Sequence, residues 1–229
     1  MATKCILCRR ELVADISWGS LFSKEEKRTI CTTCESKLDE IGDNACEKCG
    51  RRMNETSEIV TCQDCKKWSL DKKINYLQKN VACYEYNAFA KELMALYKYR
   101  GDYAVAVAFS QVLRTNCMKW SRDIIIPVPI SPERRVERGF NQTEGLLKFS
   151  GIPFETHLKR AHTEKQSKKT RRERIEQEQF FFVENNEAIK AKEILLLDDI
   201  YTTGATLHLA AEALINEGAK SVSSLTIFR

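Results

Sequence analysis

The feature that most restricts the fold of this chain is an apolar run that ends at two adjacent carboxylates. Residues 194–197 are Ile-Leu-Leu-Leu, Asp198 and Asp199 follow them, and a Thr-Thr-Gly-Ala-Thr turn occupies 202–206. A short apolar run is typical of a strand buried in a parallel sheet. The periodic segment 205–217, which Gly218 ends, then predicts a helix. This order of elements predicts an α/β domain.

Strands and helices are expected to alternate on the N-terminal side of this segment as well. Strands are predicted at 80–86, 123–128, 180–183, 193–198 and 221–228, and helices at 87–99, 103–119, 133–138, 141–149 and 205–217. Residues 157–179 form a long polar, basic stretch. The pattern predicts a mostly parallel sheet flanked by helices over residues 67–229.

The turn at 202–206 has the composition of a phosphate-binding loop. Glycine and small side chains let backbone N–H groups approach phosphate oxygens, and the start of a helix adds favourable partial charge. Asp198 and Asp199 would repel phosphate, but they can accept hydrogen bonds from sugar hydroxyls. The end of a central strand is also where ligands bind in open α/β sheets. A phosphorylated ribose suits this arrangement; the alternative is a threonine-rich helix cap beside two solvated carboxylates.

Eight of the ten cysteines form four CxxC pairs within residues 1–66. They are Cys5/Cys8, Cys31/Cys34, Cys46/Cys49 and Cys62/Cys65. Two such pairs supply the four thiolates of a tetrahedral zinc site. Residues 1–66 are therefore predicted to form a small double zinc ribbon with two structural zinc ions. The spacing allows sequential or interleaved pairing, and redox or iron–sulfur roles are the weaker alternatives. Cys83 and Cys117 lie in apolar stretches and are expected to be buried, unreactive thiols.

Basic charge is concentrated in the second part of the chain. Residues 1–65 carry 10 Lys and Arg against 12 Asp and Glu, whereas residues 66–229 carry 27 against 20. A polyanionic ligand would therefore bind the second part, although solubility alone also explains such a balance. Phe140, Trp120 and Phe180 lie near basic residues and could stack bases, but core positions are the simpler interpretation.

The sequence carries no run of about 18 uncharged apolar residues and no apolar signal core near its N-terminus. We therefore expect a cytoplasmic protein with no membrane insertion. P-loop, HExxH, GxSxG and GxGxxG signatures are also missing from the sequence, so an ATPase or hydrolase of those types is unsupported.

Segment 194–206 resembles the signature of type I phosphoribosyltransferases. The resemblance implies that Asp198 and Asp199 hold the ribose hydroxyls of phosphoribosyl diphosphate (PRPP), accompanied by Mg²⁺. The 5′-phosphate loop would be Thr202, Thr203, Gly204, Ala205 and Thr206. The pyrophosphate loop would contain Val128 and Pro129, with Arg134, Arg135 and Arg138 neutralising the diphosphate unless they form a solvated helix face. A flexible loop covering the pocket would contain Gln166, Lys168, Lys169, Arg171 and Arg174.

Several motifs also follow the order seen in the ComF family, which the chain resembles over nearly its whole length. They are Lys98-Tyr-Arg-Gly-Asp102, Val128-Pro129, Glu-Arg-Gly-Phe-Asn-Gln at 137–142, Gln166-Ser167 and residues 198–206, preceded by the CxxC pairs. The resemblance implies a role in natural transformation, handling single-stranded DNA in the cytoplasm alongside a ComFA-like ATP-dependent translocase.

Two other functions fit the same pocket. One is an active phosphoribosyltransferase of nucleotide metabolism with an unknown acceptor, and the other is a PRPP-sensing regulator. An amidophosphoribosyltransferase is not expected, because its glutamine-hydrolysing domain needs an N-terminal cysteine nucleophile and the N-terminal cysteines here belong to CxxC pairs. No catalytic residue is predicted.

Overall fold

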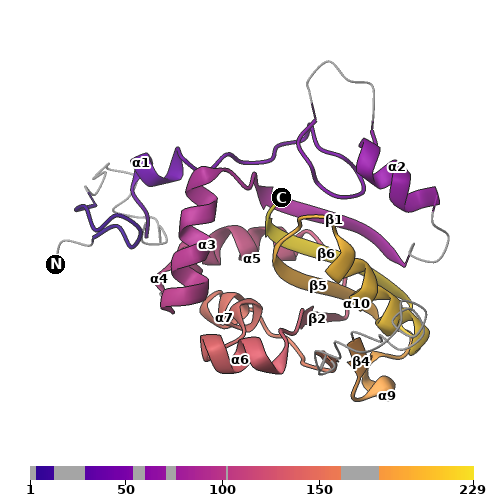
Figure 1. Cartoon of the computed structure of the whole chain (residues 1–229). Helices are drawn as coiled ribbons and strands as arrows, with labels where there is room; N and C mark the ends of the chain where they lie inside the picture. The colour runs from indigo at the N-terminus through magenta and orange to yellow at the C-terminus, as the bar shows by residue number, and fades with distance from the viewer. Residues whose placement is uncertain (1–3, 13–28, 54–59, 71–75, 102, 161–180) are drawn as a thin grey trace, which may run out of the picture.

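The computed structural model describes residues 4–12, 29–53, 60–70, 76–101, 103–160 and 181–229. Its centre is a four-stranded sheet in the order β1-β6-β5-β2 (Figure 1). The strands are β1 (Leu77–Tyr84), β6 (Ser221–Phe228), β5 (Glu193–Ile200) and β2 (Ile124–Pro127), and all three pairings are parallel. This confirms the predicted α/β class with a parallel sheet flanked by helices.

Two apolar clusters form on the two faces of the sheet. One includes side chains of α3 (Ala88–Arg100), α5 (Ser110–Met118) and α7 (Gln142–Phe149). The other includes the apolar face of α10 (Ala205–Asn216). Residues of β5 alternate between the two clusters, so this strand is covered on both faces, as its uninterrupted apolar run predicts.

The predicted helix at 103–119 is wrong as a single element. The structure has α4 (Ala104–Ala108) and α5 (Ser110–Met118), with Phe109 between them. The Phe109 ring is buried and lies 5.4 Å from that of Phe228, centroid to centroid. The Ser110 hydroxyl donates to the Val107 carbonyl at 2.9 Å. Core packing and this local side-chain hydrogen bond compete with a continuous helix.

The basic stretch from 157 begins with a strand that the sequence pattern did not predict. β3 (Leu158–Arg160) pairs antiparallel with β4 (Phe181–Val183), which is close to the predicted 180–183 strand. Leu158 and Phe181 are both buried against the α10 side of the sheet. Two further short helices are α6 (Pro132–Arg138), which follows β2, and α9 (Asn186–Ile189), which lies between β4 and β5. Among the described residues, no helix is long and apolar enough to cross a membrane.

The middle of the cysteine-rich segment, residues 39–50, packs along β1, the strand at one edge of the sheet. The cysteine-rich segment as a whole contains two short helices, α1 (Thr32–Glu35) and α2 (Gln63–Leu70). The Ile41 amide donates to the Cys83 carbonyl at 3.0 Å, and the Asn80 amide donates to the Lys48 carbonyl at 2.8 Å. Gly50 has φ +69°, and a Cβ there would lie 2.8 Å from the Ala82 nitrogen. Glycine thus permits the close approach that covers an otherwise open strand edge.

Candidate functional site

The acidic pair lies where β5 ends beside β2. Leu197 is paired with Pro127, and the next two residues of β5 are Asp198 and Asp199. The Asp199 carboxylate forms an ion pair with Lys98 of α3, with 2.6 Å between Lys98 Nζ and Asp199 Oδ2. The Asp199 amide donates to Asp198 Oδ1 at 2.8 Å. Lys98 therefore neutralises Asp199. Asp198 forms no ion pair with a lysine or arginine among the described residues.

The environment of Asp198 favours its neutral form. Burial raises the pKa of this carboxyl well above its usual range, and the nearby Asp199 charge adds to the effect. The Asp199 amide and Lys98 act in the opposite direction. A carboxylate that is costly to ionise in the free protein is stabilised when a ligand brings hydrogen-bond donors to it.

This pKa shift predicts a pH-dependent stability. The unfolded Asp198 ionises near pH 4, but the folded carboxyl keeps its proton to a higher pH. The free energy of unfolding should therefore fall as pH rises from about 4 until the raised pKa is passed. Asp198→Asn has no carboxyl at this position and therefore lacks this fall in the free energy of unfolding. The difference in stability between the variant and the parent should therefore grow in favour of the variant as pH rises. Melting curves of ligand-free protein at several pH values would test this, and parallel curves for the two proteins would contradict it.

The turn after β5 is shaped to leave its backbone open. Gly204 has φ +86°, and a Cβ there would lie 2.2 Å from the hydroxyl of the buried Tyr201. No larger residue fits without displacing that ring. Gly204 is the N-cap of α10 and supplies no side-chain cap, although Thr203 Oγ1 accepts from the Ala205 amide at 3.3 Å. The other four residues of the turn are exposed, namely Thr202, Thr203, Ala205 and Thr206. An exposed helix N-terminus of this kind suits a phosphate.

Two residues from distant parts of the chain hold this turn. The Arg229 guanidinium donates to the Thr202 carbonyl at 2.7 Å and lies 4.7 Å from the Tyr201 ring centroid. Its other terminal nitrogen lies 3.5 Å from Cys49 Sγ. On α2, the Trp68 indole donates to the Thr203 carbonyl at 3.0 Å. Arg229 therefore links the second CxxC cluster to the expected phosphate loop, and Trp68 of α2 contacts that loop directly.

The segment after β2 carries the predicted arginines on an exposed helix. No residue of α6 is buried. Arg138 donates to Gln142 Oε1 at 2.9 Å, and Arg135 lies 3.5 Å from the Glu144 carboxylate. Arg160 of β3 also belongs to this region, because desolvation and the charge of Arg134 lower its pKa while Asp198 raises it. Arg160 therefore lies close enough to both Arg134 and Asp198 for their charges to act on it.

Val128 and Pro129 are poor sources of backbone donors. Val128 is buried and its amide already donates to the Leu197 carbonyl at 2.9 Å. Pro129 has no N–H. Diphosphate contacts in this loop would therefore have to come from residues after Pro129 and from α6.

Sequence reasoning placed the covering loop at Gln166, Lys168, Lys169, Arg171 and Arg174, all of which lie outside the described residues. It missed Lys98 as the partner of Asp199, although Lys98 belongs to a motif shared with the ComF family. It also gave no role to Trp68 or Arg229. An isolated tryptophan or arginine has no periodic or spacing signal that would reveal a contact so distant in sequence.

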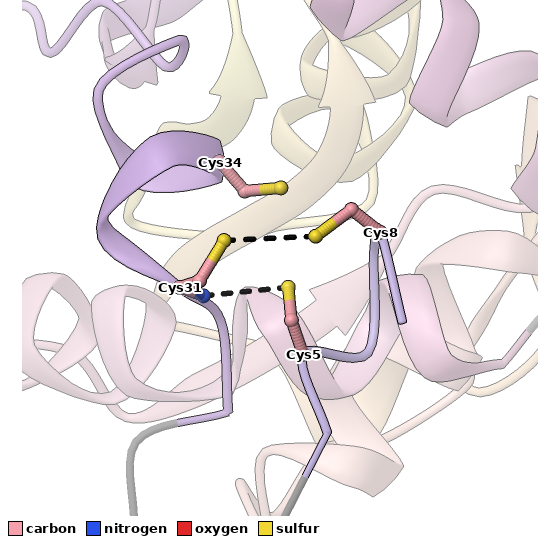
Figure 2. Close-up of side chains that lie close together, drawn as sticks. All are labelled: Cys5, Cys8, Cys31 and Cys34. Atoms are coloured by element: carbon pink, nitrogen blue, oxygen red, sulfur yellow. Dashed lines mark hydrogen bonds between the residues drawn. The ribbon is translucent and has the colours of Figure 1, made fainter. Parts of the chain in front are cut away.

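The eight CxxC cysteines form two clusters, and the pairing is sequential. Cys5, Cys8, Cys31 and Cys34 make one cluster, and Cys46, Cys49, Cys62 and Cys65 make the other, with all sulfur atoms of a cluster within 4.8 Å of one another. Figure 2 shows the first cluster, where the Sγ atoms of Cys8 and Cys31 are 3.6 Å apart. Four thiolates at about 2.3 Å from a tetrahedral zinc would be separated by about 3.8 Å. The donor set and its spacing therefore fit zinc.

Amide-to-sulfur contacts support the same interpretation. The Cys31 amide donates to Cys5 Sγ at 3.3 Å (Figure 2), and the Cys62 amide donates to Cys46 Sγ at the same distance. Such bonds orient thiolate ligands from outside the coordination shell. With four protein ligands each, the sites are closed and structural. Cys83 and Cys117 are buried elsewhere, and burial raises their pKa to about 12 and about 11, as expected of unreactive thiols.

Comparison with known proteins identifies both parts of the chain. Residues 103–229 match the phosphoribosyl transferase domain family, and residues 1–66 match the double zinc ribbon domain family. Competence protein ComFC of Bacillus subtilis is 38% identical over 98% of this chain and 94% of its own length. ComFC of Streptococcus pneumoniae is 32% identical over 99% of this chain and all of its own length. The DNA utilization protein YhgH of Escherichia coli is 25% identical over 95% and 93% of the two chains.

Proposed function

This chain belongs to the ComF family of competence proteins, and on that premise we propose that it binds incoming single-stranded DNA and PRPP during natural transformation. The observation that carries the proposal is the combination of an acidic pair, an exposed phosphate loop and an exposed arginine helix at one end of the sheet. A cytoplasmic ComFA-like ATP-dependent translocase would supply the motor activity.

The PRPP half of the proposal rests on the chemistry of the acidic pair and the turn. Asp198 and Asp199 would accept hydrogen bonds from the ribose hydroxyls, while residues 202–206 would donate to the 5′-phosphate. Arg134, Arg135 and Arg138 would neutralise the diphosphate, with Arg160 approaching from β3. Mg²⁺ binds through carboxylates and substrate phosphates, and it would accompany the diphosphate here.

The DNA half rests on a surface where exposed aromatic side chains lie among arginines. We call it the α6 surface and define it by Tyr99, Tyr103, Arg134, Arg135, Arg138 and Phe149. Tyr99 is 68% exposed, and the Arg138 guanidinium lies 5.6 Å from its ring centroid. The rings of Tyr103 and Phe149 are 5.5 Å apart and both remain exposed. Aromatic platforms beside basic side chains are what single-stranded nucleic acid requires, since bases stack and phosphates need cations.

Titration of a labelled oligothymidylate with the zinc-loaded protein, followed by fluorescence anisotropy, tests the proposal. Stacking on an aromatic side chain contributes about 1–3 kcal/mol per base, so Tyr99→Ala should weaken binding by about tenfold. Met118→Ala, which truncates an equally exposed apolar side chain on α5, is the matched control and should have little effect. Binding should also weaken steeply with salt.

PRPP with Mg²⁺ should be titrated separately by calorimetry. Binding of PRPP without any binding of DNA at low salt would reject the DNA-handling half and leave a PRPP-sensing protein. Release of diphosphate with an added base would instead favour an active phosphoribosyltransferase. Failure of both ligands to bind would reject the proposal as a whole.

A further inference from the structure

A cavity adjoins the proposed phosphate loop on the side of the zinc ribbon. It has a volume of about 600 Å³ and is lined by Arg51, Asp64, Lys67, Trp68, Thr202 and Thr203. The first four residues belong to the second zinc cluster's segment and to α2, and the two threonines belong to the turn described above. The cavity is therefore shared between the two parts of the chain, and it reaches the exposed residues of the phosphate loop.

The lining combines cations with an indole. Lys67 is exposed, and Arg51 is partly exposed while paired with Asp64 at 2.5 Å. The Trp68 indole stacks on His208, with ring centroids 4.5 Å apart, and its N–H is fixed on the Thr203 carbonyl at 3.0 Å. Trp68 is thus held rigidly at the cavity wall. A fixed aromatic beside a lysine and two threonine hydroxyls offers a stacking surface and phosphate contacts within one nucleotide's reach.

We propose that this cavity is a nucleotide subsite for single-stranded nucleic acid. A strand that places one phosphate on the 202–206 loop would continue into the cavity, with its neighbouring base on Trp68 and the next phosphate at Lys67. The second zinc cluster would then build part of the nucleic-acid site by positioning α2. This inference rests on the proposed DNA-handling function and extends it from the α6 surface to the opposite side of the phosphate loop.

The cavity volume favours this occupant. A cavity of about 600 Å³ lies within the usual range for small-ligand sites. Its contact with residues 202–203 means that a ligand filling it lies next to whatever phosphate the loop holds. A nucleotide within a strand meets both conditions, because its linkage to the next nucleotide is itself a phosphodiester.

The test compares two neighbouring lysines of α2. Lys67 lines the cavity, whereas Lys66 is also exposed on the same helix but is not among the lining residues. With a labelled oligothymidylate of about 12 nucleotides, Lys67→Ala should weaken binding roughly fivefold and reduce the slope of affinity against salt by about one phosphate contact. Lys66→Ala should stay within about twofold of the parent. Zinc content and melting temperature would be matched across the proteins first.

A second measurement locates the oligonucleotide base relative to Trp68. An oligonucleotide carrying 5-iodouracil, irradiated in the complex, should crosslink to the peptide that contains Trp68. Equal effects of the two lysine substitutions, or crosslinks found only on other peptides, would overturn the subsite while leaving DNA binding intact. Loss of all oligonucleotide binding by the unaltered chain would overturn the DNA function and the subsite together.

A free nucleotide is the remaining alternative ligand, and thymidine 5′-monophosphate distinguishes it. If the monophosphate displaces the labelled oligothymidylate only weakly, the nucleic-acid strand is the ligand. If it binds as tightly as the oligonucleotide and depends equally on Lys67, the cavity takes free nucleotides and the strand model is rejected.

Discussion

Replacing Cys62 with serine is expected to remove one of two zinc ions and to abolish PRPP binding, whereas replacing Cys8 should remove the other ion and preserve that binding. A structural zinc supplies an apparent 10–16 kcal/mol, so a segment as small as residues 46–65 should unfold without it. The second cluster also holds the 202–206 turn, which is the proposed phosphate loop, through Arg229 between Cys49 and Thr202 and through Trp68 on Thr203. Cys46→Ser should behave like Cys62→Ser.

Cys8→Ser is the matched control because the first cluster meets the sheet domain elsewhere. Asn87, which caps the start of α3, donates from its side chain to the Lys37 carbonyl at 2.9 Å in the first ribbon. Lys98 lies eleven residues further along the same helix, about 16 Å away at 1.5 Å per residue. Metal analysis, thermal melting and PRPP calorimetry on both variants would decide the matter. Full zinc content and an unchanged melting profile in Cys62→Ser, or equal loss of PRPP binding in Cys8→Ser, would contradict the expectation.

Local patterns predicted the local features of this fold well. The apolar run before Asp198, the Gly204 turn and the periodic segment after it lie within one short stretch, so their arrangement follows from strand and helix geometry alone. The Gly204 position shows why: only a residue without Cβ avoids the Tyr201 ring three residues earlier. The sequence pattern therefore identified the parallel sheet and its acidic end before the structure placed them.

Contacts between distant segments could not be predicted in the same way. Spacing allowed the four CxxC pairs to combine sequentially or in interleaved fashion, and the structure shows the sequential arrangement. The choice depends on how the second ribbon packs on β1, where Asn80 donates from its side chain to the Cys49 carbonyl at 3.1 Å. Nothing in the sequence near Cys49 encodes that partner. The same reason explains why Trp68 and Arg229 were missed, since each acts on a turn more than twenty residues away.

Replacing Lys98 alone should damage the protein more than replacing Lys98 and Asp199 together. The pair is partly buried, with side chains 19% and 12% exposed, and its atoms are 2.6 Å apart. Lys98→Met leaves the Asp199 charge uncompensated beside Asp198, which costs about 3 kcal/mol for a pair of this kind. Asp199→Asn in the same chain removes that charge and should restore most of the stability. Lys220→Met, which breaks an exposed 2.7 Å pair with Glu193, is the matched control and should change little.

The parent, Lys98→Met, Asp199→Asn and the double variant together separate stability from ligand binding. Asp199→Asn removes a charged acceptor for a ribose hydroxyl, and such a hydrogen bond contributes about 1.5–3 kcal/mol. PRPP affinity should therefore fall by roughly 10–100-fold in Asp199→Asn and stay low in the double variant, even though the double variant is stable. Urea unfolding and PRPP calorimetry form a double-mutant cycle with two readouts. Additive stability losses would show that Lys98 does not act through Asp199. Recovery of PRPP affinity in the double variant would show that Asp199 is not a ribose ligand but only the partner that fixes the end of α3.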